Sequence, residues 1–493
     1  MKRKQVMAGE IKYPVGIQDF RKLREMGYVY VDKTQFIKKM ISSPKYYFLS
    51  RPRRFGKSLF LTTLEAYFEG DRNLFKGLAL DSDEVDWTPR PVIKFSFNAV
   101  RAKEKDNLDK YLETTLSAYE RKYEVKFIVG DLTDRFATII RHAKEKTGQK
   151  VAILVDEYDA ILLDTLRSEL SDLNNYYRQT LKSLFSVLKN EDANIQLAFV
   201  TGISRFSQTS LFSGANHLKD ISMLEEYDSI CGITEDELRT LFIPGLKKFA
   251  DKIKKDSVDV LALLKENYDG YHFSETCPDI YNPYSLLQAL EDKKISNYWF
   301  KAATPSFLID ILKDDDFYMP SLDCIETVES DLSAKESYLH NPVSLLFESG
   351  YVTIKGYEEE SAIYTLGLPN LEVAKSFTEA LLPIYSGYDK DKTTEFFIKI
   401  RRCIINGEPK QFMEELKTFL HGNPYGLTEL DKREKYFQSC LYLMLRALGF
   451  QPQAEYQTCN ARMDMMIRTN RFIYIFELKT NGTAQEAMDQ INE

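Results

Sequence analysis

The chain has 493 residues, which predicts two to four domains, since one core seldom exceeds about 250–300 residues. Its composition of 44% hydrophobic and 28% charged residues is that of a water-soluble globular protein, and no run approaches the ~18 apolar residues of a membrane helix. The formal net charge of −8 argues against a broad basic face that coats nucleic acid, so any such contact should be local.

The cysteines and the N-terminus favour a cytoplasmic protein. None of the 6 cysteines has a partner at CxxC spacing, and the 5 histidines are scattered. The first ten residues carry charge, but no apolar segment of a signal peptide follows. We therefore expect reduced thiols, a cytoplasmic location and no membrane contact.

The first part of the chain alternates strand and helix patterns. Short apolar runs predict strands at 46–50, 92–97, 151–155 and 196–200. Apolar residues at helical spacing predict helices at 58–68 and 108–123. This alternation predicts an α/β domain with a parallel sheet and flanking helices, which we place at residues 1–234.

Two regions of different pattern follow. Helical patterns dominate residues 235–430, at 235–242, 257–267, 283–292, 372–382, 393–404 and 410–420, with a strand pair near 351–354 and 362–364. Residues 431–493 read as a helix at 436–448, strands at 453–457, 463–467 and 472–478, and a helix from 483. We expect a mostly helical middle region and a small α+β domain at the C-terminus.

A phosphate-binding loop is the clearest local motif. Residues 51–58 read Arg-Pro-Arg-Arg-Phe-Gly-Lys-Ser, which keeps the end of the pattern G-x-x-x-x-G-K-[ST] but has Arg51 at the first glycine. The loop joins a predicted strand to a predicted helix, where backbone N–H groups bind anions. We expect Lys57 to contact the β- and γ-phosphates of ATP and Ser58 to bind Mg²⁺. The other expected ATP contacts are Arg53, Arg54, Phe55, Gly56 and Leu59, and Arg51 is expected to add positive charge beside them.

Two carboxylates follow the strand at 151–155. A P-loop NTPase needs an aspartate at such a strand end to hold Mg²⁺, so we assign Asp156 to the metal. Glu157 is then positioned as the general base for the attacking water. An acidic turn that caps the next helix is the structural alternative, and Asp159 is either an outer partner of the metal or a solvated side chain.

The strand at 196–200 supplies two further candidates. Thr201 is predicted to sense the γ-phosphate at the strand end, and Arg205 to stabilise charge in the transition state, as arginine fingers do. A strand-capping threonine and a surface arginine are the alternatives. The sequence leaves open whether Arg205 acts in its own chain or on a neighbour in a homo-oligomer.

Taken together, these strings resemble the bacterial AAA-ATPase-like proteins with a C-terminal PD-(D/E)xK nuclease-superfamily domain. The matching segments are 13–20, 30–34, 51–58, 156–159, 211–214, 268–271, 281–283 and 366–370. The phosphate loop of that family also lacks the first glycine. The resemblance implies an ASCE-type P-loop core, a helical middle region and a restriction-endonuclease-like C-terminal domain at residues 431–493.

The C-terminal domain carries a D…ExK pattern. Asp464 lies on one predicted strand, and Glu477 and Lys479 share one face of the next. Asp464 and Glu477 are expected to bind one Mg²⁺ while Lys479 orients or activates a water. Glu434, Glu455 and Gln490 resemble the accessory residues of the superfamily. The chain ends within the helix after the ExK strand, where the superfamily continues into another strand, so we expect a truncated domain.

Three functions remain open from the sequence. One is a Mg²⁺-dependent ATPase, a hydrolase, coupled to a nuclease-like domain that acts on DNA or RNA. The alternative is an ATP-driven switch whose nuclease-like domain is inactive and only binds a partner. The third, a structural protein with a dead ATP site, is disfavoured by the intact Lys57, Ser58, Asp156 and Glu157.

Overall fold

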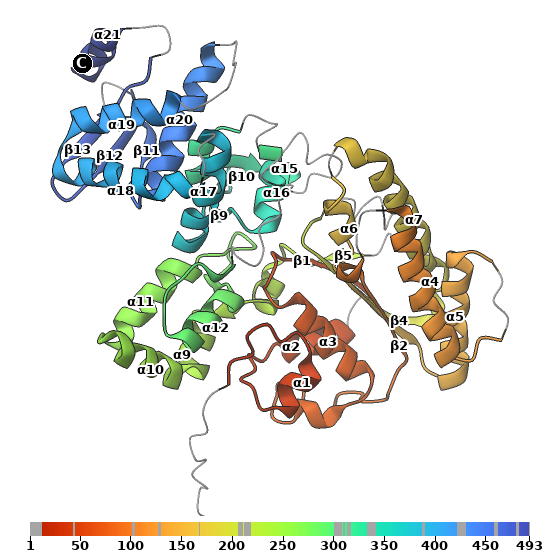
Figure 1. Cartoon of the computed structure of the whole chain (residues 1–493). Coiled ribbons are helices and arrows are strands. Elements are labelled where there is room, and N and C mark those ends of the chain that lie inside the picture. The colour runs from red at the N-terminus through yellow and green to blue at the C-terminus, as the bar shows by residue number, and fades with distance from the viewer. Residues whose placement is uncertain are drawn as a thin grey trace, which may run out of the picture. The chain divides into compact units, whose positions relative to one another are not determined.

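The computed structural model describes residues 12–42, 45–100, 104–126, 130–166, 168–205, 211, 218–299, 308, 311–312, 317–332, 342–386, 390–421, 430–457, 462–479 and 483–492. The chain divides into two compact units (Figure 1). Unit 1 comprises Met1–Ala303 and Thr327–Tyr364, and unit 2 comprises Thr304–Glu326 and Thr365–Glu493. Residues 235–303 thus cluster with the N-terminal part, and the division at 234 and 430 stays a prediction. Most of the 211–214 motif lies outside the described residues.

A parallel sheet forms the centre of unit 1. Its strands are β1 (Tyr46–Ser50), β2 (Val92–Ser96), β3 (Val151–Asp156), β4 (Ile195–Gly202) and β5 (Lys219–Asp220). They run in the order β2-β3-β4-β1-β5, and every pair is parallel. All residues of β1 and β3 are buried, as the continuous apolar runs predicted. The predicted parallel α/β sheet is confirmed, and β4 separates the strand before the phosphate loop from the strand before the carboxylates.

Helices cover both faces of this sheet (Figure 1). One face carries α4 (Lys105–Lys122), α5 (Leu132–Thr147) and α7 (Ser171–Asn190), whose apolar residues share one core with the strands. The other face carries α3 (Lys57–Phe68), where the rings of Phe60 and Phe199 lie 5.5 Å apart. The remaining helices of this region are α1 (Phe20–Glu25), α2 (Thr34–Ile41) and α6 (Ala160–Leu163).

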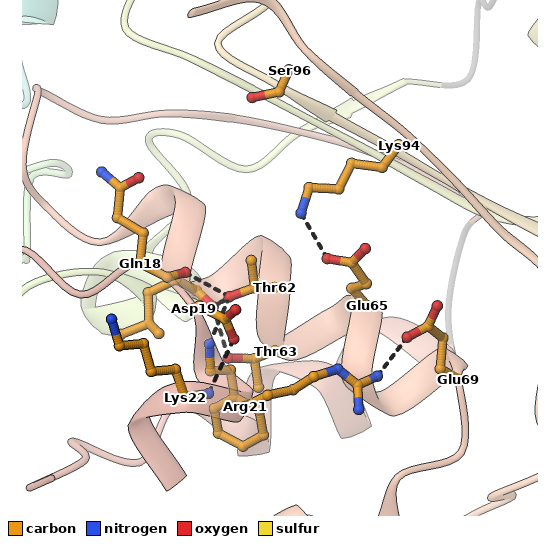
Figure 2. Close-up of polar contacts among 12 residues, drawn as sticks. Gln18, Asp19, Arg21, Lys22, Thr62, Thr63, Glu65, Glu69, Lys94 and Ser96 are labelled. Atoms are coloured by element: carbon orange, nitrogen blue, oxygen red, sulfur yellow. Dashed lines mark hydrogen bonds and ion pairs between the residues drawn. The ribbon is translucent and has the colours of Figure 1, made fainter. Parts of the chain in front are cut away.

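Polar contacts connect α3 and the residue after it to the segment before α1, to α1 and to β2 (Figure 2). The Thr62 hydroxyl donates a hydrogen bond to the Gln18 carbonyl over 2.8 Å. Glu65 pairs with Lys94 of β2 at 2.7 Å, and Glu69 pairs with Arg21 of α1. These contacts lie along the exposed side of α3, so the helix that begins at the phosphate loop is held at several points.

A small helical bundle follows the sheet in unit 1. Its helices are α9 (Glu235–Leu241), α10 (Ile243–Ile253), α11 (Ser257–Tyr268) and α12 (Pro283–Asp292), which share a hydrophobic core. A capping box of Thr234 and Glu237 starts α9. The short strands β6 (Ile233–Thr234) and β7 (Ile280–Tyr281) pair antiparallel beside the bundle. Tyr13 and Val29 of the N-terminal segment pack against the same core.

The strand pair expected near 351–354 and 362–364 is present. It consists of β9 (Thr353–Glu358) and β10 (Ile363–Gly367), and a third strand, β8 (Ile325–Val328), gives the sheet order β8-β10-β9. The helices α15 (Glu329–Leu332) and α16 (Pro342–Ser349) precede β9. The end of α16 returns to the phosphate loop, as described below.

Unit 2 contains helices and an antiparallel sheet. The helices are α17 (Leu371–Ser386), α18 (Lys390–Asn406), α19 (Pro409–His421), α20 (Leu430–Ala447) and α21 (Ala484–Asn492). The strands β11 (Gln453–Gln457), β12 (Arg462–Arg468) and β13 (Ile473–Phe476) form an antiparallel sheet in sequential order. The helix–strand–strand–strand–helix pattern predicted here is observed. In the described parts of both units, every helix is too short or too polar to cross a membrane.

Candidate functional site

The loop between β1 and α3 has the geometry of an anion site. Gly56 has φ +101° at the N-terminus of α3, and a Cβ added there would meet no atom within 4 Å. Among the described residues, no side chain makes a capping hydrogen bond at this helix end. The N–H groups of a first helical turn without a cap, together with the positive end of the helix dipole, favour an anion.

Lys57 is directed toward the carbonyls of its own loop rather than into solvent. Its side chain is buried, and its Nζ donates hydrogen bonds to the carbonyls of Arg51 at 2.8 Å and Pro52 at 3.0 Å. Burial lowers the pKa of Lys57, and the charges of Glu157 and Asp156 oppose that shift. The lysine thus lies within electrostatic reach of the predicted acidic residues.

The Arg51 side chain is bonded to other segments of unit 1, and its expected contribution of positive charge beside the phosphate site stays a prediction. It is 1% exposed, and its Nη1 donates to the Ser222 carbonyl at 2.6 Å while its Nη2 donates to the Tyr227 carbonyl at 3.2 Å. Its guanidinium carbon lies 3.9 Å from the ring centre of Phe273. These carbonyl oxygens and the aromatic face of Phe273 are the partners that a buried guanidinium needs.

Two segments that are distant in sequence contact the phosphate loop. The Trp299 indole N–H donates to the Arg53 carbonyl at 3.0 Å. Gly350 has φ +83°, and a Cβ there would lie 2.7 Å from both the Cβ and the Cγ of Pro52. Only a glycine permits this approach without a shift. The loop is therefore held by residues about 250 and 300 positions away in sequence.

The other predicted ATP contacts differ in exposure. Arg54 is exposed, with φ +68°, and its guanidinium lies 5.0 Å from the ring centre of Tyr284. Phe55 is 1% exposed and packs edge-on to Tyr271 at 4.8 Å, so its side chain belongs to the core. Ser58 is partly buried in the first turn of α3.

The carboxylate of the last residue of β3 is hydrogen-bonded to β4. Asp156 is 4% exposed, and its Oδ1 accepts a hydrogen bond from the Thr201 hydroxyl at 2.8 Å. Glu157 is partly buried, with φ +51°, a conformation that L-residues adopt at a cost. Thr201 itself is fully buried. Adjacent parallel strands thus bring Asp156 and Thr201 to one edge of the sheet.

Asp159 is a buried anchor and not a solvated side chain. It is 0% exposed, and its Oδ2 accepts the backbone N–H groups of Ile203 at 2.9 Å and Ser204 at 2.6 Å. Its Oδ1 has no hydrogen-bond partner among the described residues. Burial raises the pKa of Asp159 to about 6, and the charge of Lys57 acts in the opposite direction.

Arg205 is engaged within its own chain. Its Nε donates to Asp220 Oδ2 at 2.9 Å, its Nη1 contacts Met223 Sδ at 3.1 Å, and its side chain is 15% exposed. Its role as an arginine finger stays a prediction, and it would require this ion pair to open.

An apolar cavity of about 80 Å³ adjoins the phosphate loop. Its wall combines the loop, the N-terminal segment and the helical bundle, including Gly56, Leu59, Tyr30, Ile233 and Leu287. Lys33 also lines it, and its Nζ lies 2.6 Å from Glu237 Oε1. Burial lowers the pKa of Lys33, and the charge of Glu237 opposes this. The cavity is thus apolar with one polar end.

The D…ExK residues of unit 2 come together, with Asp464 on β12 and with Glu477 and Lys479 just after β13, which ends at Phe476 and not at 478 as predicted. Met465 pairs with Phe476, so Asp464 and Glu477 follow as cross-strand neighbours. Asp464 Oδ2 accepts the Leu478 N–H at 2.7 Å, and Lys479 Nζ lies 3.0 Å from Glu477 Oε1. Burial raises the pKa of Asp464, and the charge of Glu477 adds to this shift.

The accessory positions are only partly described. Glu455 Oε1 accepts hydrogen bonds from Gln438 at 3.1 Å and Tyr318 at 3.2 Å, and Gln438 also donates to the Asp464 carbonyl. Glu434 lies within electrostatic reach of Lys479. The side chain of Gln490 lies outside the described residues. Within the part of the chain that the structure describes, no three His, Cys, Asp or Glu side chains are arranged to hold a metal ion. The metal assignment to Asp464 and Glu477 stays a prediction.

Sequence reasoning missed three contacts of the phosphate site. Trp299, Glu348 and Gly350 belong to no motif, and they approach the site only through the fold. A lone tryptophan or glycine far from the loop carries no local signal of such a contact.

Comparisons with known proteins agree with this architecture. Residues 14–212 match a family model described as "Predicted AAA-ATPase", and residues 432–493 match one described as "PD-(D/E)XK nuclease superfamily". The chain is also 35% identical over 492 residues to a protein of Azotobacter chroococcum mcd 1 named "Uncharacterized protein in vnfD 5'region". That similarity covers 98% of this chain and 92% of the relative. The chain therefore belongs to the AAA-ATPase-like proteins that carry a C-terminal domain of the PD-(D/E)XK nuclease superfamily.

Proposed function

We propose that this protein binds and hydrolyses ATP with Mg²⁺ at the site around Lys57 and Asp156, and that its restriction-endonuclease-like C-terminal domain acts on nucleic acid. The observation that carries the ATPase proposal is the convergence of a buried lysine with Asp156, Glu157 and Asp159 beside an uncapped helix N-terminus. A phosphate and a divalent cation together match this arrangement of donors and carboxylates.

The chemistry of the residues fits both ligands. The open space at Gly56 admits phosphate oxygens to the N–H groups of α3, and the buried Oδ1 of Asp159 retains acceptor capacity. Mg²⁺ would supply charge neutralisation between the β- and γ-phosphates. Ser58 and Asp156 would hold it, and Thr201 orients Asp156 through its hydroxyl.

Glu157 is the proposed base for the attacking water, because it follows Asp156 directly and its charge interacts favourably with that of Lys57. The apolar cavity beside Gly56 and Leu59 is the proposed site of the base of the nucleotide, since these loop residues line it and its lining is mainly apolar.

The alternative is an ATP-driven switch whose nuclease-like domain only binds a partner. The contacts of two carboxylates favour it. Glu477 forms an ion pair with Lys479, and Glu455 accepts hydrogen bonds from Gln438 and Tyr318, so both carboxylates already have partners within the protein. A nuclease requires them to be released toward a metal ion.

Trp299 provides a direct assay of nucleotide binding. The two tryptophans are Trp87 and Trp299, and the second donates to the phosphate loop at Arg53. In a Trp87→Phe background, ATP should therefore change the fluorescence of Trp299, and Lys57→Ala should abolish this change. Lys94→Ala, which removes a lysine paired with Glu65 on the outer side of α3, is the matched control and should respond like the wild type.

Steady-state turnover completes the test. ATP hydrolysis should be lost in Lys57→Ala and retained in Lys94→Ala, and stimulation by single- or double-stranded DNA would support the nucleic-acid role. Turnover that ignores DNA would favour the switch. Wild-type turnover in Lys57→Ala would refute the site. Mg²⁺-dependent nicking that disappears in Asp464→Ala would support the nuclease.

A further inference from the structure

The backbone that follows β4 is held by side chains at three successive N–H groups. Asp159 accepts those of Ile203 and Ser204, and Glu348 accepts that of Arg205 over 2.9 Å. The carbonyls are held as well, because the Tyr158 hydroxyl donates to Ser204 at 2.9 Å. Backbone donors are commonly bonded to other backbone groups, so three in a row on carboxylates is unusual.

Glu348 differs from the other partners of this segment in its origin. Tyr158 and Asp159 follow β3 and belong to the matched AAA-ATPase-like region, which ends at residue 212. Glu348 lies near the end of α16, is 4% exposed, and comes from beyond that region. Two residues later, Gly350 contacts Pro52 of the phosphate loop. The end of α16 and the glycine that follows it therefore approach both the backbone after β4 and the phosphate loop.

We propose that Glu348 is a positioning residue for ATP hydrolysis, which fixes the backbone after β4 and thereby the placement of Thr201 and Arg205. The inference rests on the proposed ATPase function. Thr201 lies near the end of β4, four residues before Arg205, and its hydroxyl donates to Asp156. Release of the Arg205 N–H would let this segment shift, and shifts of about 1 Å at a reacting centre can cost on the order of 100-fold in rate.

The charge around Arg205 supports the same role. Asp220 pairs with its guanidinium at 2.9 Å, and Glu348 adds a second favourable interaction with its positive charge. The carboxylate of Glu348 thus accepts the backbone N–H of Arg205 and interacts favourably with the charge of the same residue. Glu348 is not among the proposed nucleotide contacts on the phosphate loop, so its replacement should leave the affinity for ATP unchanged.

The test compares Glu348→Ala with Glu348→Gln. The alanine variant loses the acceptor, whereas the glutamine amide oxygen can still accept the Arg205 N–H. We expect Glu348→Ala to lower kcat about 10- to 100-fold. Its ATP dissociation constant and binding stoichiometry, measured by Trp299 fluorescence, should stay within about 3-fold of wild type. Glu348→Gln should restore most of kcat. This split between kcat and binding, with rescue by the conservative variant, would not result from a merely structural role.

Glu120→Ala is the matched control. Glu120 is 3% exposed and pairs with Arg135 at 2.7 Å between α4 and α5, so its removal also opens a buried ion pair, but away from the site. It should lower the melting temperature and leave kcat unchanged. A Glu348→Ala variant with wild-type kcat would overturn the inference, as would one in which kcat, affinity and stoichiometry fall together. In both cases wild type and Glu120→Ala would still hydrolyse ATP, whereas failure of the proposed function would leave all variants inactive and remove the inference with it.

Discussion

Replacement of Thr201 by valine tests the link between β3 and β4 at the site. Valine keeps the shape of the side chain but removes the hydroxyl that donates to Asp156 over 2.8 Å. Both residues are almost fully buried, so water cannot replace the lost donor freely. Hydrogen bonds to charged groups contribute roughly 1.5–3 kcal/mol, so we expect Thr201→Val to lower the free energy of unfolding by about 2 kcal/mol. Thr201→Ser keeps the hydroxyl and should lose only about 0.8 kcal/mol for its methyl group.

Urea denaturation followed by tryptophan fluorescence is the suitable assay. Trp87 and Trp299 both belong to unit 1, so the signal reports the unit that contains Thr201. Under the ATPase proposal, the valine variant should also need more Mg²⁺ for half-maximal turnover, because Asp156 loses its orienting bond. Equal stability of Thr201→Val and wild type would refute this reasoning, as would a serine variant less stable than the valine one.

Three further results are expected. Glu157→Gln should retain ATP binding and lose turnover, and loss of binding would show that the roles of Asp156 and Glu157 are divided differently. Because burial raises the pKa of Asp159 from 3.8 to about 6, the folded protein keeps a proton between these pH values that the unfolded chain has lost. Stability should therefore fall by up to ~1.4 kcal/mol per unit as the pH rises from 4 to 6, and Asp159→Asn should lack this component of the slope in urea titrations. Asp464→Ala should leave ATP turnover intact, since the residue lies in unit 2, and a loss of turnover would show that the units are coupled.

The sheet and most helices were predictable because their signals are local. The strand at 151–155 is a continuous apolar run, and the structure extends it by one residue to Asp156. The helix at 283–292 was predicted with the observed bounds, since Pro283 starts it and Asn282 caps it. Helix α7 (Ser171–Asn190) was not predicted, although its apolar residues follow a helical period.

The candidate site was predictable only in part. Lys57, Asp156 and Thr201 lie near one another because parallel strands bring their carboxyl ends to one edge of the sheet. This rule can be applied once the strands have been predicted from the sequence. Glu348 could not be found in this way, since its contact depends on how residues 342–349 pack after a long intervening bundle. The same holds for Trp299, whose single indole N–H carries no motif.

Arg51 shows why a departure from a motif need not mean loss of a site. In the described loop, positive φ values occur at Arg54 and Gly56 and not at residue 51, so the position of the missing first glycine does not demand one. The guanidinium instead bonds to carbonyls of the segment at 222–228 and stacks on Phe273, while the carbonyl of the same residue accepts Lys57. A turn glycine provides conformational freedom, whereas Arg51 joins the loop to two other segments, the one at 222–228 and the one that contains Phe273. The shape of the anion site is then set by tertiary contacts rather than by the loop sequence, and it is at such contacts that sequence patterns alone are least informative.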